Sequence, residues 1–170
     1  MRTIIASLAA ATALAGCAAD EGPGRMPATQ DPAVQDGPTI TYSTAPCFGV
    51  CPVYTVTVHA DGHGTFVGRQ HVAAEGEREF VATQHDLQLF QEVLAPYRPA
   101  SGEKIIAPGQ NCEHQATDMA SVDVRWTAPD GTTQHLDYYY GCDMEKNREM
   151  AKALRNAPQY LPIGAMIEGR

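Results

Sequence analysis

The chain has 170 residues, a length that suits one folded domain with a substantial hydrophobic core. Its 12 Lys and Arg side chains against 20 Asp and Glu give a formal net charge of −8 at pH 7. Because phosphate backbones and anionic lipid surfaces are bound by clustered cations, this acidic balance disfavours nucleic acid and anionic lipid as partners.

The first 16 residues have the pattern of an export signal. Arg2 is followed by an apolar run over residues 4–14, which is too short to span a bilayer as a permanent helix. The run ends in a Leu-Ala-Gly-Cys segment at residues 14–17, which resembles the bacterial lipoprotein signal. This resemblance implies cleavage after residue 16 and acylation of the Cys17 thiol. We therefore expect residues 1–16 to be a signal peptide and the protein to lie in the cell envelope.

Residues 17–38 are expected to join the lipidated cysteine to the folded domain as a flexible tether. From Ala18 to Pro38 the chain has too few large apolar side chains to offset the entropy that folding would cost. Acyl chains on Cys17 would attach the protein to the membrane without a basic patch. Ala18, rather than an aspartate, follows the cysteine, which resembles the sorting pattern for the outer membrane, with the domain facing the periplasm.

The segment from residue 39 to residue 82 predicts β-strands. Ile40 and Tyr42 alternate with polar residues, and a second alternation runs over residues 53–59. A glycine-rich turn follows and returns the chain into residues 65–69, which predicts a hairpin. Residues 78–82 are expected to add a further strand at the edge of the sheet.

Thr83 is expected to begin an α-helix, because Asp86 follows it at the spacing of a capping box. The apolar residues at helical spacing that give this helix a core-facing side are Leu87, Phe90, Leu94 and Tyr97. Two prolines, Pro96 and Pro99, end the helix. We expect residues 98–118 to be an irregular loop, of a length that is often functional when ordered.

The C-terminal part predicts a second hairpin and a second helix. Apolar residues alternate over 122–127 and again over 135–140, on either side of a Pro-Asp-Gly turn. Asp143 is expected to cap a final helix that ends near Asn156. These elements predict an α+β fold, in which antiparallel β-hairpins form a sheet with two α-helices packed on one face. We expect this two-layer arrangement to be a single domain over residues 39–170.

Four cysteines remain once Cys17 is assigned to the lipid. An even number of cysteines in an exported protein indicates two disulfides, and three pairings are compatible with the sequence. Proximity along the chain favours Cys47–Cys51, which leaves Cys112–Cys142.

The segment from Pro46 to Tyr54 resembles the signature of a bacterial family of unknown function, Cys-Phe-Gly-x-Cys-Pro-x-Tyr at the start of a β-hairpin. Further matches to this family are Asp-Gly at residues 61–62, Phe-Val-Gly at 66–68 and Thr-Asp at 117–118. The resemblance covers about residues 39–165. It implies no activity, substrate or catalytic residue, because none is established for the family.

Cys47 and Cys51 allow three chemical interpretations. A structural disulfide is favoured, because Gly49 lets a short ring close between two prolines. A redox dithiol usually has Cys-x-x-Cys spacing at a helix N-terminus, whereas here three residues separate the cysteines and a strand follows. Metal ligation by thiolates is disfavoured in an oxidising compartment. The sequence predicts no metal, no cofactor and none of the common hydrolase motifs.

These observations favour a non-enzymatic, lipid-anchored binding or accessory module that contacts an envelope protein or polymer. The expected contact residues are Phe48 and Val50, at the tip of the cysteine loop, and Tyr139, which lies between two tyrosines that point into the core. An exposed Tyr139 close to Trp126 would extend such a surface. Two alternatives stay open: a periplasmic thiol–disulfide oxidoreductase that uses Cys47 and Cys51, and an inhibitor that presents their loop to an envelope enzyme.

Overall fold

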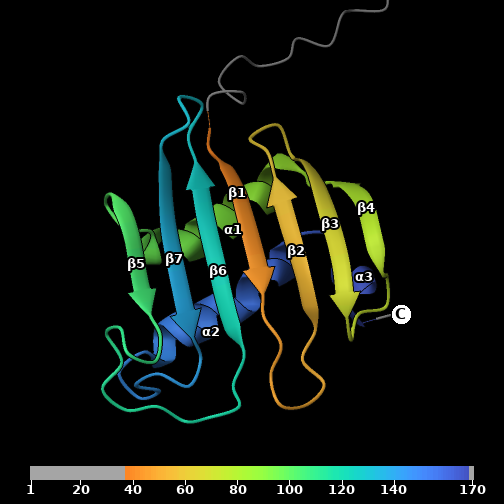
Figure 1. The fold of residues 1–170 in the computed structure, drawn as a ribbon. Coiled ribbons are helices and arrows are strands. Elements are labelled where there is room, and N and C mark those ends of the chain that lie inside the picture. Colours follow the sequence, from red (N-terminus) through yellow and green to blue (C-terminus); the bar gives the residue numbers. More distant parts are fainter. Residues whose placement is uncertain (1–36, 169–170) are drawn as a thin grey trace, which may run out of the picture.

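The structure of the protein, a computed structural model, describes residues 37–168. The expected signal peptide, Cys17 and the tether before Gly37 therefore lie outside the described residues. The described residues have a mixed α+β fold, with a seven-stranded, mostly antiparallel sheet and three α-helices (Figure 1). No helix among them is long and apolar enough to cross a membrane.

The strands follow the alternation of apolar and polar residues in the sequence. They are β1 (Thr39–Thr44), β2 (Val53–Val58), β3 (His63–Gln70), β4 (Gly76–Val81), β5 (Gly102–Ile106), β6 (Ser121–Thr127) and β7 (Thr133–Tyr139). Their order across the sheet is β4-β3-β2-β1-β6-β7-β5. All neighbours pair antiparallel except β5 and β7, which are parallel. The edge position that we expected for residues 78–82 is confirmed by β4.

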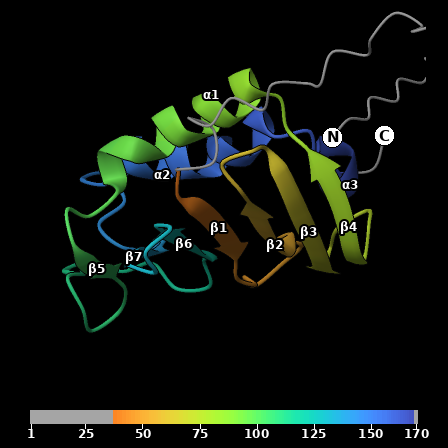
Figure 2. The same ribbon diagram turned by 90° about the horizontal axis from the view of Figure 1, so that it is seen from above.

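The helices lie on one face of the sheet, as Figure 2 shows for α1 (Gln84–Leu94) and α2 (Arg148–Asn156). The core fills the space between these layers, where Tyr42 of β1 and Phe66 of β3 are fully buried. Leu94 of α1 and Leu154 of α2 meet them from the helix side. The opposite face of the central strands carries hydroxyl side chains, such as Ser43 and Thr55, so the sheet buries one side only.

The start of α1 confirms the predicted capping box. The Asp86 N–H donates to the Thr83 hydroxyl, and the Asp86 carboxylate accepts from the Thr83 N–H at 3.2 Å. Leu87, Phe90 and Leu94 are the buried residues of the helix. The 3-10 helix η2 (Ala95–Tyr97), with Pro96 in its first turn, follows directly.

The expected loop over residues 98–118 is wrong in its first part, because residues 102–106 form β5. This strand has few apolar residues of its own, and it forms by parallel pairing with β7, for example Lys104 with Leu136. Two helices were expected, whereas the described residues form three. The third, α3 (Gly164–Glu168), is too short for a periodic pattern, and the carbonyls of Met166 and Ile167 accept from the N–H groups of Ala74 and Ala73.

The expected start of the last helix is also wrong. Asp143 has a positive φ of 41°, and α2 begins five residues later, after Asn147. The carboxylate of Asp143 does not cap α2, because it accepts hydrogen bonds from another segment, described below. The helix ends at Asn156, as expected, and continues as the 3-10 helix η3 (Ala157–Tyr160).

Candidate functional site

The connection between β1 and β2 is a short loop closed by a disulfide. Cys47 and Cys51 are bonded, with their Cα atoms 5.8 Å apart. Gly49, in the middle of the ring, has a φ of 143°, which L side chains rarely adopt. The ring therefore depends on the glycine that separates the two apolar residues Phe48 and Val50. We call residues 47–51 the cysteine loop.

The two apolar side chains of the cysteine loop point into solvent. Phe48 is 89% exposed and Val50 is 82% exposed, the highest values among the exposed large hydrophobic residues of the described chain. Large apolar side chains are most often buried in a folded domain, and two neighbouring ones that are each more than 80% exposed on one tip are unusual. The cysteine loop is therefore the described part of the chain with the most exposed large apolar side chains.

The backbone on both sides of this tip is held by hydrogen bonds. The Thr44 hydroxyl donates to the carbonyl of Pro52 at 2.8 Å and accepts from the N–H of Tyr54 at 3.0 Å, so it bridges the base of the loop. The Phe48 N–H donates to the carbonyl of Asp118 at 3.1 Å. These hydrogen bonds, together with the disulfide, fix the backbone of the exposed tip.

Tyr139 lies close to the segment that holds the cysteine loop. Its ring is half-buried, its hydroxyl donates to the carbonyl of Ala116 at 2.9 Å, and the N–H of Met119 donates to it at 3.1 Å. The flanking tyrosines of the Tyr-Tyr-Tyr run are buried, as predicted. Trp126 is buried in the core with the Arg98 guanidinium 5.8 Å from its ring, so it does not extend a surface around Tyr139.

The second disulfide joins Cys112 to Cys142, with Cα atoms 5.3 Å apart, so the two pairs are those that proximity favoured. Beside it, the buried Asp143 carboxylate accepts from the N–H groups of Glu113 at 3.1 Å and His114 at 2.8 Å. These two backbone hydrogen bonds lower the pKa of Asp143. Together they fix residues 112–114 against the end of β7.

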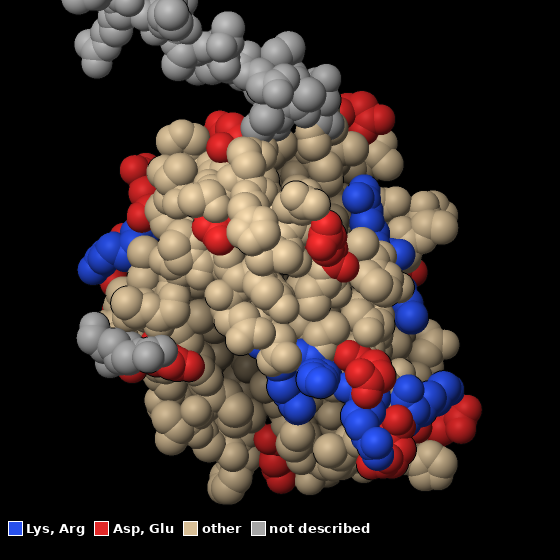
Figure 3. All heavy atoms as spheres, turned by 180° about the vertical axis from the view of Figure 1, so that it is seen from behind, with Lys and Arg blue, Asp and Glu red and all other residues tan. Residues whose placement is uncertain are grey.

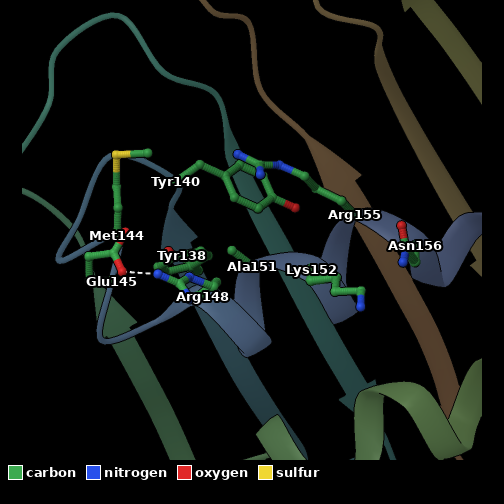
Figure 4. Close-up of a pocket in the computed structure, with 9 residues that line it drawn as sticks. All are labelled: Tyr138, Tyr140, Met144, Glu145, Arg148, Ala151, Lys152, Arg155 and Asn156. Carbon is green, nitrogen blue, oxygen red and sulfur yellow. Dashed lines mark hydrogen bonds and ion pairs between the residues drawn. The ribbon is translucent and has the colours of Figure 1, made fainter.

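The structure also brings together cations that we did not connect in the sequence. Arg148, Lys152 and Arg155 lie three and four residues apart on α2 and line one pocket with Tyr140 (Figure 4). Figure 3 shows Lys and Arg side chains gathered on the face of the molecule that bears the helices. Helical spacing was the signal that would have revealed this group, because residues at i, i+4 and i+7 share one face.

Two histidines, His59 and His63, flank the turn between β2 and β3. His59 Nδ1 lies 3.0 Å from the Thr39 hydroxyl, and Asp61 accepts from the N–H of His63. Within residues 37–168, no three His, Cys, Asp or Glu side chains are grouped in a way that would hold a metal ion.

The described residues thus combine a mixed α+β fold with an exposed, disulfide-closed loop and a separate cationic pocket. Residues 38–160 match the family called DUF6438, a domain of unknown function, and the chain belongs to this family. The match begins at residue 38 and thus excludes the expected signal and Cys17. No curated protein matches the chain.

Proposed function

We propose that this chain is a lipid-anchored, non-enzymatic binding module of the bacterial cell envelope, which contacts an envelope protein through the cysteine loop. The observation that carries the proposal is the near-complete exposure of Phe48 and Val50 on a tip with a fixed backbone. A buried aromatic ring contributes about 150–250 Å² of contact area, which suits an anchor at the centre of an interface. Tyr139 supports the tip from the neighbouring segment.

The anchor in this proposal is the acylated Cys17. Residues 1–16 would be the signal peptide, residues 17–38 the tether, and residues 39–170 a single two-layer domain. A coil of about 20 residues extends roughly 25 Å, so the cysteine loop would work close to the membrane surface. We place the protein at the outer membrane, facing the periplasm. Mass spectrometry of the purified protein should find an acylated Cys17 as the first residue, whereas an unmodified N-terminus at Met1 would contradict this part.

The docking role is tested by replacing the two apolar side chains of the cysteine loop with serine. The double variant Phe48→Ser, Val50→Ser should fold normally, because neither side chain is in the core, and should lose the partner that co-purifies with the wild-type protein after chemical cross-linking. Val81→Ser is the matched control, because Val81 is also an exposed apolar residue, at 61%, but lies at the end of the edge strand β4. If the partner co-purifies equally with the double variant and with the Val81→Ser control, the proposal is overturned.

The redox alternative rests on the same two cysteines, which are half-buried beside the exposed tip. A redox titration with alkylation and peptide mapping separates the two functions. A structural Cys47–Cys51 bond should stay oxidised below about −300 mV, whereas a catalyst of disulfide exchange would titrate at roughly −200 to −120 mV. If the captured partner proves to be a hydrolase whose activity falls on binding, the loop acts as an inhibitor rather than as an accessory contact.

A further inference from the structure

The pocket on α2 concentrates positive charge in a chain that is acidic overall. It has a volume of about 320 Å³, and its charged lining residues are Arg148, Lys152, Arg155 and Glu145. Three cations and one carboxylate leave a local charge of +2, in a protein whose formal net charge is −8. A local field of opposite sign to that of the whole protein marks a site that attracts anions.

Two of these cations have no carboxylate partner. Glu145 forms an ion pair with Arg148, seen as the dashed line in Figure 4, and so neutralises one of the three cations. Among the described residues, neither Lys152 nor Arg155 forms an ion pair. Both are exposed, so a ligand would reach them without any rearrangement of the core.

Arg155 is nevertheless held in place. Its guanidinium carbon lies 4.3 Å from the centre of the Tyr140 ring, and Figure 4 shows the guanidinium crossing that ring. Stacking on an aromatic face keeps all five N–H donors of an arginine available for an anion. Burial raises the pKa of Tyr140 to about 12, so the phenol stays neutral near pH 7 and adds no negative charge to the pocket.

The remaining walls are suited to an organic group beside the anion. Tyr138, Tyr140 and Ala151 are buried residues that form the apolar floor, and Met144, 49% exposed, lies at the margin. Asn156 contributes an amide at the end of α2. The pocket thus combines a net positive lining with an apolar floor, and in Figure 4 the exposed Lys152 side chain points away from the Tyr140 ring on which Arg155 stacks.

The geometry points to a binding site for a phosphate monoester, with the phosphate on Lys152 and Arg155 and the organic group on the apolar floor. A phosphate monoester carries a charge of about −1.5 to −2 at pH 7, which matches the local charge of +2, and its three oxygens accept from several donors at once. A single phosphate needs only these few cations, unlike a nucleic acid. The site is independent of the cysteine loop and of the function proposed for it.

The test follows the methionine methyl signals by NMR while phenyl phosphate is added to the purified, methyl-labelled full chain. The Met144 methyl should shift, and the Met119 methyl should not, because Met144 lines the pocket and Met119 does not. Lys152→Gln and Arg155→Gln should each weaken binding about tenfold, as expected for the loss of a charged hydrogen bond. Lys104→Gln, which removes the same charge on β5, should bind as the wild type does.

Two further ligands identify the source of the phosphate. Tighter binding of soluble dihexanoyl phosphatidic acid than of phenyl phosphate would assign the site to a lipid headgroup, and the reverse order would assign it to a small phosphate ester. No Met144 shift with any of these ligands at about 10 mM, ten times a Kd of about 1 mM, would overturn the inference. An equal shift with acetate, or binding that Lys152→Gln leaves unchanged, would also overturn it.

Discussion

The N–H of Phe48 donates to the carbonyl of Asp118 at 3.1 Å, across 70 residues of sequence. Asp118 has a positive φ of 66°, and the next residue, Met119, donates its own N–H to the Tyr139 hydroxyl. The exposed tip is therefore held by the connection between β5 and β6, which is held in turn by a tyrosine of β7. The position of the cysteine loop depends on these contacts as well as on its disulfide.

Tyr139→Phe should destabilise the protein by about 1–2 kcal/mol, because it removes the hydroxyl that bonds both Ala116 and Met119. Urea denaturation of the variant measures this loss. Tyr160→Phe is the control, since the Tyr160 hydroxyl forms no hydrogen bond within the described part of the chain. Equal effects of the two substitutions would show that the Tyr139 hydroxyl does not hold the 116–119 segment.

The two disulfides should contribute unequally to stability. In the chain-entropy picture, replacing Cys47 and Cys51 by serine costs about 2 kcal/mol, whereas replacing Cys112 and Cys142 costs about 3–4 kcal/mol, because that pair closes a longer loop. Denaturant melts of the two double variants, each with the other disulfide intact, give the comparison. A larger loss on removing Cys47–Cys51 would mean that the cysteine loop contributes to the core rather than only to the shape of the tip.

Asp143 should make the folded state sensitive to acid. Folding lowers its pKa below the unfolded value of about 3.9, so it stabilises the protein above that pH, and this contribution is lost as the pH falls through the folded pKa. Asp143→Asn removes the titrating group and one of the two charge-assisted hydrogen bonds. The variant should be less stable than the wild type at pH 7, and the difference should shrink below about pH 4. A constant difference across this range would contradict the assignment.

The effect of Asp137 on the pH dependence of stability should have the opposite sign to that of Asp143. Burial, and then the neighbouring Asp123 carboxylate, raise the pKa of Asp137, so its ionised form weakens the fold above the folded pKa and the penalty vanishes below the unfolded one. Asp137→Asn is expected to raise the thermal midpoint at pH 7 and to leave it unchanged at about pH 3. A lower midpoint at pH 7 would show that the ionised carboxylate is needed, for instance by the cation of Arg125.

The strands and the first helix were predictable because each depends on local pattern. The alternation around Tyr42 and the Thr83–Asp86 capping box are complete within a few residues of sequence. The features that were missed depend on distant partners. The strand β5 forms because β7 offers it an edge, and Asp143 fails to cap α2 because its carboxylate binds the N–H groups of residues 113 and 114.

The two candidate sites also differ in this way: the local sequence indicated the cysteine loop, whereas the cationic pocket depends on the folded structure. The sequence indicated the cysteine loop, since the short Cys-x-x-x-Cys spacing leaves Phe48 and Val50 little room to be buried. The cationic pocket was missed because the basic residues were weighed over the whole chain, where acidic residues outnumber them. Only the helix brings Arg148, Lys152 and Arg155 to one face, beside a tyrosine from the end of β7.

The central claim, that the cysteine loop docks to a partner protein, is tested most directly by placing a photoreactive amino acid at position 48 in the living cell. Irradiation should give one discrete protein adduct at position 48 and none at position 81, and the Val50→Ser substitution should abolish that adduct. Adducts at both positions, or at neither, would contradict the claim, because Phe48 and Val81 are both exposed and only Phe48 lies on the rigid tip.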